Sequence, residues 1–126
     1  MRLLAALSIM IVLLVVMGLW INHSITEAAQ ELSGHVQLIS REVKQSDWLQ
    51  ANKQIAELEQ KWRQIGSWWP AVLDHQEIDN IEFSLAKAKE YLAAGDRVHS
   101  LAQLSELNLM ILHLPEKESL QLKNIL

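Results

Sequence analysis

One stretch near the start of the chain constrains the fold more than any other feature. Residues Leu3 to Ile21 form a run of 19 residues without a charged side chain, and twelve of them are Leu, Ile or Val. A helix of this length spans roughly 28 Å, close to the roughly 30 Å hydrocarbon core of a bilayer. Trp20 stands at the far end, where indole rings sit in the membrane interface. The run therefore predicts a single transmembrane span, and we expect a signal-anchor helix over residues 1–22.

A cleaved signal peptide is the alternative for this run. Signal peptides carry an apolar stretch of about 7–15 residues that ends at a site of small residues. The run here is longer and ends in Trp20 and Ile21, although Thr26-Glu27-Ala28 offers a cleavage site a few residues later. Its length favours a retained anchor.

The charges on the two sides of the run predict its orientation. Arg2 and the N-terminal amine precede it, whereas Glu27 and Glu31 follow it, and the next basic residue is Arg41. By the positive-inside rule the N-terminus lies in the cytoplasm. We expect a single-pass protein of a bacterial cell membrane, with its C-terminal domain extracytoplasmic.

The rest of the chain is acidic and lacks cysteine. It carries all 15 acidic residues and all but one of the 11 basic residues. This balance argues against a nucleic-acid partner, which requires clustered Lys and Arg. The absence of Cys excludes disulfides, zinc–thiolate sites and cysteine nucleophiles. With only 4 Gly and 2 Pro, the chain is expected to have short loops and to be mostly helical.

Apolar spacing predicts an all-α fold beyond the anchor. Residues 23–46 carry apolar side chains at helical spacing, which indicates a juxtamembrane amphipathic helix that can continue the anchor without a break. Ser46-Asp47 then reads as a break and a helix N-cap, and Gly66 as a C-cap shortly before Pro70. Between these signals runs a seam in steps of three and four: Trp48, Ala51, Ile55, Leu58, Trp62, Ile65 and Trp69.

Two further helices complete the expected extracytoplasmic helical domain, residues 47–126. Asp74 and Glu77 have the form of a capping box, in which Asp74 accepts from the Glu77 backbone N–H and Glu77 reaches back. Gly95-Asp96 ends this helix and begins the next, which is expected to stop before Pro115 and to be followed by a short turn over Ser119 to Leu126. Amphipathic helices with short connections predict a small antiparallel bundle or a stack of helical hairpins.

A faint internal echo appears at a spacing of 49 residues. Five residues of the first seam align with five near the C-terminus: Asp47, Ile55, Leu58, Trp62 and Ile65 with Asp96, Leu104, Leu107, Ile111 and Leu114. Helical repeats produce such echoes. Any two amphipathic helices slid into register produce them too, and on the sequence alone this second explanation is the stronger one.

Residues Asp74 to Glu82 form the stretch richest in candidate ligands. His75, Asp79 and Glu82 follow one another at i, i+4 and i+7 and share a helix face. Metal sites in bundles need matching ligands from a second helix, and no Glu-x-x-His occurs in the chain. Acidic residues are also favoured in the first turns of any helix by its dipole. We therefore predict no bound metal and no cofactor, and keep these three residues as metal candidates that lack a partner set.

No catalytic signature is present. The chain has no G-x-S-x-G elbow, and its glycines are too far apart for a phosphate-binding loop. We expect a protein that is not an enzyme. The candidate interface residues are Trp68, Trp69, Asp74 and His75. An exposed Trp68 is a natural anchor for a protein partner, because Trp is enriched at binding hot spots. The alternative is that Trp68 packs beneath the turn between two helices.

Several of these motifs together resemble a known family. The stretch Asp74-His75-Gln76-Glu77-Ile78-Asp79-Asn80-Ile81-Glu82, with Trp68-Trp69 before it and Pro115-Glu116-Lys117-Glu118 and Asn124-Ile125-Leu126 after it, is similar to the uncharacterised bacterial family called domain of unknown function 4363. The resemblance implies a small anchored helical protein and implies no activity.

These observations lead to two functional hypotheses. The first is a non-enzymatic membrane protein whose helical domain binds another protein or helps to assemble an envelope structure. The alternative is a sensor at the membrane surface that binds a metal or a small ligand through His75, Asp79 and Glu82.

Overall fold

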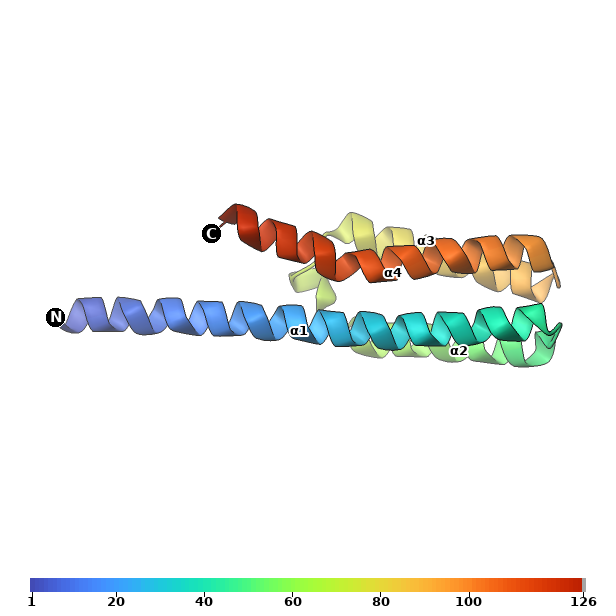
Figure 1. The fold of residues 1–126 in the computed structure, drawn as a ribbon, viewed down its shortest axis with the longest axis horizontal. Helices are drawn as coiled ribbons and strands as arrows, with labels where there is room; N and C mark the ends of the chain where they lie inside the picture. The colour runs from blue at the N-terminus through green and yellow to red at the C-terminus, as the bar shows by residue number, and fades with distance from the viewer. Residues whose placement is uncertain (126) are drawn as a thin grey trace.

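The chain folds into an antiparallel bundle of helices. The computed structural model describes residues 1–125, with the side chains of residues 1–115. The elements are α1 (Arg2–Lys44), α2 (Trp48–Ile65), the short 3-10 helix η1 (Trp69–Ala71), α3 (His75–Ala93) and α4 (Arg97–Ile125). Each helix packs on its two neighbours around the bundle, so that α1 contacts α2 and α4, and α3 contacts the same two (Figure 1). No strand occurs in residues 1–125, and the predicted all-α class is confirmed.

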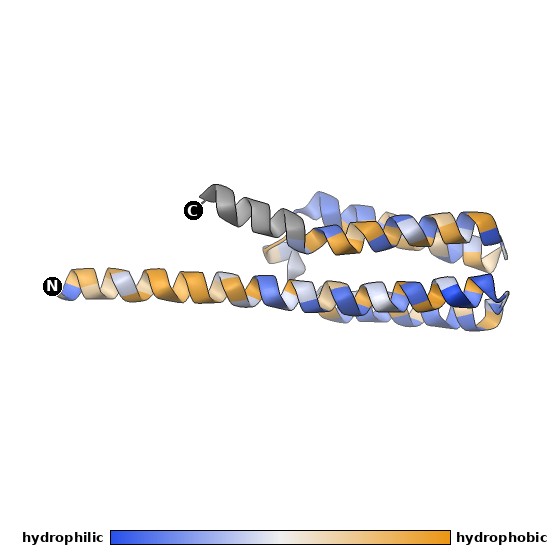
Figure 2. Cartoon of the chain, viewed as in Figure 1, coloured by the Kyte–Doolittle hydropathy of each residue, from blue (hydrophilic) through white to orange (hydrophobic). Residues whose placement is uncertain are grey.

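The first helix, α1, extends well beyond the helices that pack against it. Its N-terminal part projects alone from the bundle and is strongly apolar (Figures 1 and 2). Its C-terminal part is buried at helical spacing, through Ile25, Ala29, Leu32, Ser33, Val36, Ile39 and Val43. The helix is therefore the unbroken continuation of the apolar run that the sequence allowed. Residues 25–43 are one of the four walls of the bundle core rather than a separate juxtamembrane segment.

The predicted seam of α2 forms the core, with one difference at its end. Ala51, Ile55, Leu58 and Trp62 are buried within α2. Trp69 is fully buried as well, although α2 ends at Ile65 and Trp69 belongs to η1. The apolar surface of the seam thus continues across the turn. Each large side chain removed from water in this way contributes about 1.5–3 kcal/mol.

The two turns at the end of the bundle far from the N-terminal apolar run have the same design. Ser46 and Gly95 follow the ends of α1 and α3 with φ of 59° and 67°. The next residues, Asp47 and Asp96, donate their backbone N–H to the carbonyl five positions earlier, at 2.9 and 3.0 Å. Each of these Asp carboxylates then accepts the backbone N–H three positions later. Both turns therefore combine a Schellman C-cap with an Asp N-cap, which satisfies backbone groups on both sides of the break.

The 49-residue echo extends through whole helical hairpins. The turns just described are 49 residues apart, and so are the buried positions on both sides of them. On α1 and α3 the matched buried pairs are Leu32 and Ile81, Val36 and Leu85, Ile39 and Ala88, and Val43 and Leu92; on α2 and α4 they are Ala51 and Ser100, Ile55 and Leu104, Leu58 and Leu107, and Trp62 and Ile111. Sliding single helices into register does not explain one offset shared by two helices and a turn. The bundle is built from two hairpins, residues 29–65 and 78–114, in equivalent registers.

The expected helix end before Pro115 is wrong. Pro115 lies inside α4, which continues to Ile125 and includes the described part of the short turn expected over 119–126; Leu126 lies outside the described residues. A proline removes one backbone hydrogen bond and crowds the preceding turn, which a helix tolerates by bending. Figure 1 shows the last turns of α4 bending away from the axis of the preceding turns, at the end of the bundle from which the N-terminal apolar run projects.

Candidate functional site

Four of the five tryptophans form a continuous chain at the end of the bundle from which the N-terminal apolar run projects. Trp62 and Trp69 meet edge to face with ring centroids 5.2 Å apart, and Trp69 and Trp68 meet edge to face at 6.4 Å. Trp68 then stacks on Trp20 of α1, with centroids 6.4 Å apart and planes inclined by 26°. Aromatic pairs contribute about 0.5–1.5 kcal/mol each beyond their buried area. The chain of rings links the bundle core to the end of the apolar run.

The turn after α2 places these rings. Gly66 donates its backbone N–H to the Trp62 carbonyl at 2.8 Å and ends the helix, as predicted. A Cβ at Gly66 would lie 2.7 Å from that carbonyl oxygen, so this close approach requires glycine. Pro70 then pre-sets the backbone of η1. Trp69 is driven into the core while Trp68 is turned toward α1.

Both sequence-based expectations for Trp68 describe part of its environment. The ring packs under the turn against Trp69 and against Trp20, and 37% of Trp68 is still exposed. The contact with Trp20 could not be expected from the sequence, because 48 positions separate the two residues and no local spacing relates them. Trp69, the other candidate, is fully buried in the described structure and offers no surface to a partner.

Asp74 and His75 lie at the start of α3, next to this turn, and both are exposed. Asp74 is the N-cap of α3, as expected. Its carboxylate accepts the Gln76 backbone N–H at 3.1 Å, whereas the Glu77 N–H bonds to the Asp74 backbone carbonyl. An N-cap side chain can reach either of these positions in the first turn, and the extended backbone of Asp74 selects the nearer one.

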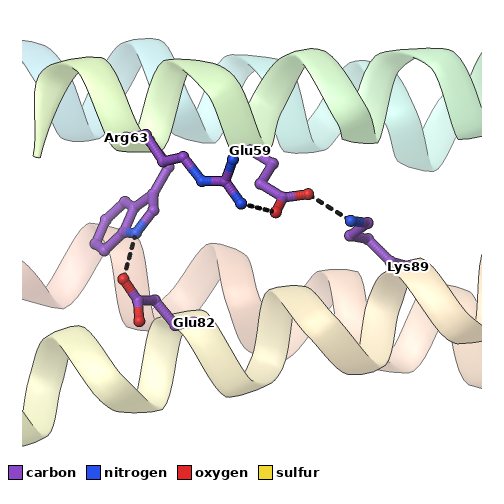
Figure 3. Close-up of polar contacts among 5 residues, drawn as sticks. Glu59, Arg63, Glu82 and Lys89 are labelled. Carbon is purple, nitrogen blue, oxygen red and sulfur yellow. Dashed lines mark hydrogen bonds and ion pairs between the residues drawn. The ribbon is translucent and has the colours of Figure 1, made fainter.

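The three metal candidates are not brought together with further ligands. Glu82 accepts the Trp62 indole N–H at 3.3 Å (Figure 3). All three candidates, His75, Asp79 and Glu82, are exposed. Across the part of the chain that the structure describes, no three His, Asp or Glu side chains are placed to hold a metal ion. The geometry therefore supplies no coordination set for the sensor hypothesis.

A charged network lines the groove between α2 and α3. Glu59 accepts from Arg63 at 2.6 Å and from Lys89 of α3 at 2.5 Å (Figure 3). The hydrogen bond from Lys89, aided by the charges of Lys89 and Arg63, lowers the pKa of Glu59 despite partial desolvation. The groove has a volume of about 300 Å³ and is also lined by Trp62 and Glu82. Because these polar groups bond to one another, the network ties the two helices together.

A second cleft of about 510 Å³ lies between α1 and α4. Arg41 and Lys44 line it from the last turn of α1, where the helix dipole favours cations. Asn108 lines it from α4, and its side-chain oxygen accepts from the Ser33 hydroxyl at 2.5 Å. The position of Arg41 and Lys44 at the C-terminal end of α1 accounts for the charge of the cleft, which therefore gives no separate indication of a ligand.

The family comparison agrees with these boundaries. A family model described as a domain of unknown function, DUF4363, matches residues 19–125. This chain belongs to the DUF4363 family. The match confirms the resemblance drawn from the sequence motifs. The DUF4363 region begins next to Trp20 and contains the whole bundle, so all four stacked rings lie within it. No curated protein and no solved structure matches the chain.

One more cluster in the DUF4363 region has the residue types of a hydrolase triad. His99 Nδ1 lies 2.8 Å from Asp96, and hydrogen bonds from His99, its backbone N–H first, lower the pKa of Asp96. The adjacent Ser100 is fully buried, and its hydroxyl has no hydrogen-bond partner in the described structure. A triad requires a hydroxyl bonded to the imidazole and open to substrate. The Asp96–His99 pair therefore belongs to the start of α4 and gives no hydrolytic chemistry.

Proposed function

We propose that this DUF4363 protein is a single-pass, non-enzymatic membrane protein whose helical bundle stands outside the bacterial cytoplasm and binds another protein. One observation carries the anchor part. In the described residues, α1 is the one helix long and apolar enough to cross a membrane, and none of its apolar window is buried.

The exposed apolar run favours a bilayer as its surroundings. The core helix of a soluble domain would bury these side chains, whereas every large hydrophobic residue from Leu3 to Trp20 is exposed. Insertion of such a run gains on the order of 5 kcal/mol. Because the same helix continues into the core, the bundle is held rigidly at the end of the span. The orientation rests on Arg2 before the run and on Glu27 and Glu31 after it.

The equivalence of the two hairpins supports a protein partner. On the outward face of α4, four exposed and uncharged residues follow one another in steps of three and four: Ala102, Ser105, Leu109 and Leu112. The equivalent exposed positions of α2, 49 residues earlier, are Lys53, Ala56, Gln60 and Arg63. The fold therefore accepts polar groups at these positions, and the two leucines are not needed for it. Two exposed leucines in an uncharged row at this spacing suit an amphipathic helix of a partner.

Membrane fractionation and protease protection test the anchor. The full chain should stay in the membrane pellet at alkaline pH, and protease added from outside should reach residues after 22. A chain found in the soluble fraction, with the apolar run protected by its own bundle, would overturn the anchor and the topology together.

Site-specific crosslinking tests the partner. Since the chain has no native cysteine, Leu109→Cys and the matched control Gln60→Cys each carry a single thiol. A short crosslinker should join Leu109→Cys to one discrete protein in intact cells and leave Gln60→Cys unjoined. Recovery of both variants alone, as monomers, would contradict the partner.

A further inference from the structure

We propose that the turn between α2 and α3 rests on the lipid interface beside the anchor, so that the bundle stands on the bilayer in one fixed orientation. The turn comprises residues 66–73 and is called the tryptophan loop below. The proposal rests on the membrane anchor proposed above and adds a second, peripheral contact between the domain and lipid.

The depth of the loop follows from Trp20. If Leu3 to Ile21 cross the hydrocarbon, Trp20 lies at the interface, where indoles are enriched. Trp68 stacks directly on Trp20, with ring centroids 6.4 Å apart. Two rings in contact share nearly the same depth, so the position of Trp20 also sets that of the tryptophan loop. Figure 1 agrees, since this turn lies at the end of the bundle from which the anchor emerges.

The composition of the loop suits this position. Residues 64–73 contain no charged side chain. Trp68, Pro70 and Ala71 are exposed and Val72 is half-buried. These groups leave apolar surface and an indole at the end of the bundle that faces the bilayer. The loop does not need this exposed apolar surface to pack on the core or to close the turn, because Trp69 and Leu73 already supply the buried contacts.

The opposite end of the bundle is more highly charged at its turns, although the apolar side chains of Leu49 and Val98 are also exposed there. Its two turns carry Lys44, Asp47, Asp96 and Arg97, which lie at or next to the breaks between helices. Charged groups of this kind face water readily, whereas they are costly in an apolar interface. The two ends of one bundle thus differ as expected if one rests on lipid and the other faces solvent.

Depth measurements on the full chain test this proposal. The chain has no native cysteine, so Ala71→Cys in the loop, Val98→Cys at the opposite end and Met17→Cys in the anchor each give one labelling site. Each variant is labelled with an environment-sensitive fluorophore in phosphatidylcholine–phosphatidylglycerol vesicles. Quenching is then compared between a water-soluble quencher and quenchers attached to lipid.

Lipid-borne quenchers near the headgroups should quench the Ala71→Cys label several-fold more than the Val98→Cys label, and the soluble quencher should show the opposite order. Equal behaviour of the two sites would overturn the lipid contact. Protection of Ala71→Cys from both kinds of quencher would also overturn it, in favour of a covering protein. The Met17→Cys label tests the membrane anchor separately from the lipid contact of the tryptophan loop. If lipid-borne quenchers fail to quench this label, the anchor itself is contradicted.

Trp68 variants give an independent readout. In the Ala71→Cys background, Trp68→Ala should reduce quenching by lipid at least two-fold, whereas Trp68→Phe, which keeps a stacked ring, should retain most of it. Unchanged lipid quenching in Trp68→Ala, with the bundle folded by circular dichroism, would show that the loop does not depend on this ring for its contact.

Discussion

The two parts of α1 both carry apolar side chains, yet these are placed in opposite surroundings. Between Leu3 and Trp20 every large hydrophobic side chain is exposed. Between Ile25 and Val43 the apolar side chains at steps of three and four are buried by the other helices. The first part is apolar on all faces, whereas the second alternates with polar residues. Uniform hydrophobicity therefore marks the segment suited to lipid, and an amphipathic helical period marks the segment suited to a protein core.

This difference makes the two parts separable by experiment. Changes in the second part act on the free energy of unfolding of the bundle. If the first part spans a membrane as proposed, changes in it before Trp20 act on the free energy of insertion and leave the folded bundle unchanged. Six substitutions, grouped into five experiments, test how sharp this division is.

Leu32→Asp is expected to have the largest effect. Leu32 is 0% exposed in the second part of α1, and a buried carboxylate without a partner costs several kcal/mol, more than about 4. The bundle should lose its cooperative melt by circular dichroism in detergent. A near-normal melt would mean that this part of α1 is dispensable for the core.

Trp62 lies on α2, and its ring faces the second part of α1. Trp62→Ala removes this ring. Trp62 is buried, packs on Trp69 and donates to Glu82. We expect a loss of about 3–5 kcal/mol, which nearly unfolds a domain of ordinary stability. Thermal melts of the native chain and of Trp62→Ala measure this loss. An unchanged melting midpoint would refute the assignment of Trp62 to the buried seam of α2.

Leu14→Asp is the matched change in the first part of α1. A carboxylate at mid-membrane makes insertion less favourable by about 3 kcal/mol. The extracted fraction at alkaline pH should rise, while the melting midpoint in detergent stays that of the native chain, because Leu14 is exposed in the bundle fold. A lowered midpoint would show that the two parts of α1 are not independent.

The turn that ends α1 can be compared with its equivalent after α3. Gly95 has φ of 67°, and Gly95→Ser should destabilise the bundle by about 1–2 kcal/mol, the cost of a left-handed side-chain residue. Ser46 has φ of 59° in the matching position, so Ser46→Gly should raise the melting midpoint slightly. Shifts of the same sign in both variants would contradict the equivalence of the turns.

Glu59→Gln is expected to have the smallest effect, because it touches neither part of α1. Glu59 has a pKa below its ordinary value of 4.5 through Lys89 and Arg63. Its stabilisation, about 1 kcal/mol for a partly exposed network, is present above pH 4.5 and is lost as the pH falls through the lowered pKa. The melting midpoints of the native chain and Glu59→Gln should differ at pH 7 and converge as the pH falls below the lowered pKa of Glu59. A constant difference across this range would exclude the carboxylate charge as the cause.

Much of the fold could be predicted, and little of the site. Helix breaks at Asp47 and Gly95, the cap at Asp74 and the all-α class follow from local signals. The continuation of α4 through Pro115 could not be predicted, because local propensity opposes it. Likewise Glu59 and Arg63 form an i, i+4 pair that the sequence displays, but Lys89 joins them from another helix.

By itself the sequence determined the apolar run, the helical periods and the capping residues, since each depends on neighbours within one or two turns of chain. The tertiary structure alone decided that Trp68 stacks on Trp20, that Lys89 reaches Glu59, and that both hairpins share one register. Contacts of this kind depend on how far each helix is rotated about its axis and shifted along it against its neighbours. Those two quantities are set when four apolar faces pack together, and no single segment encodes them.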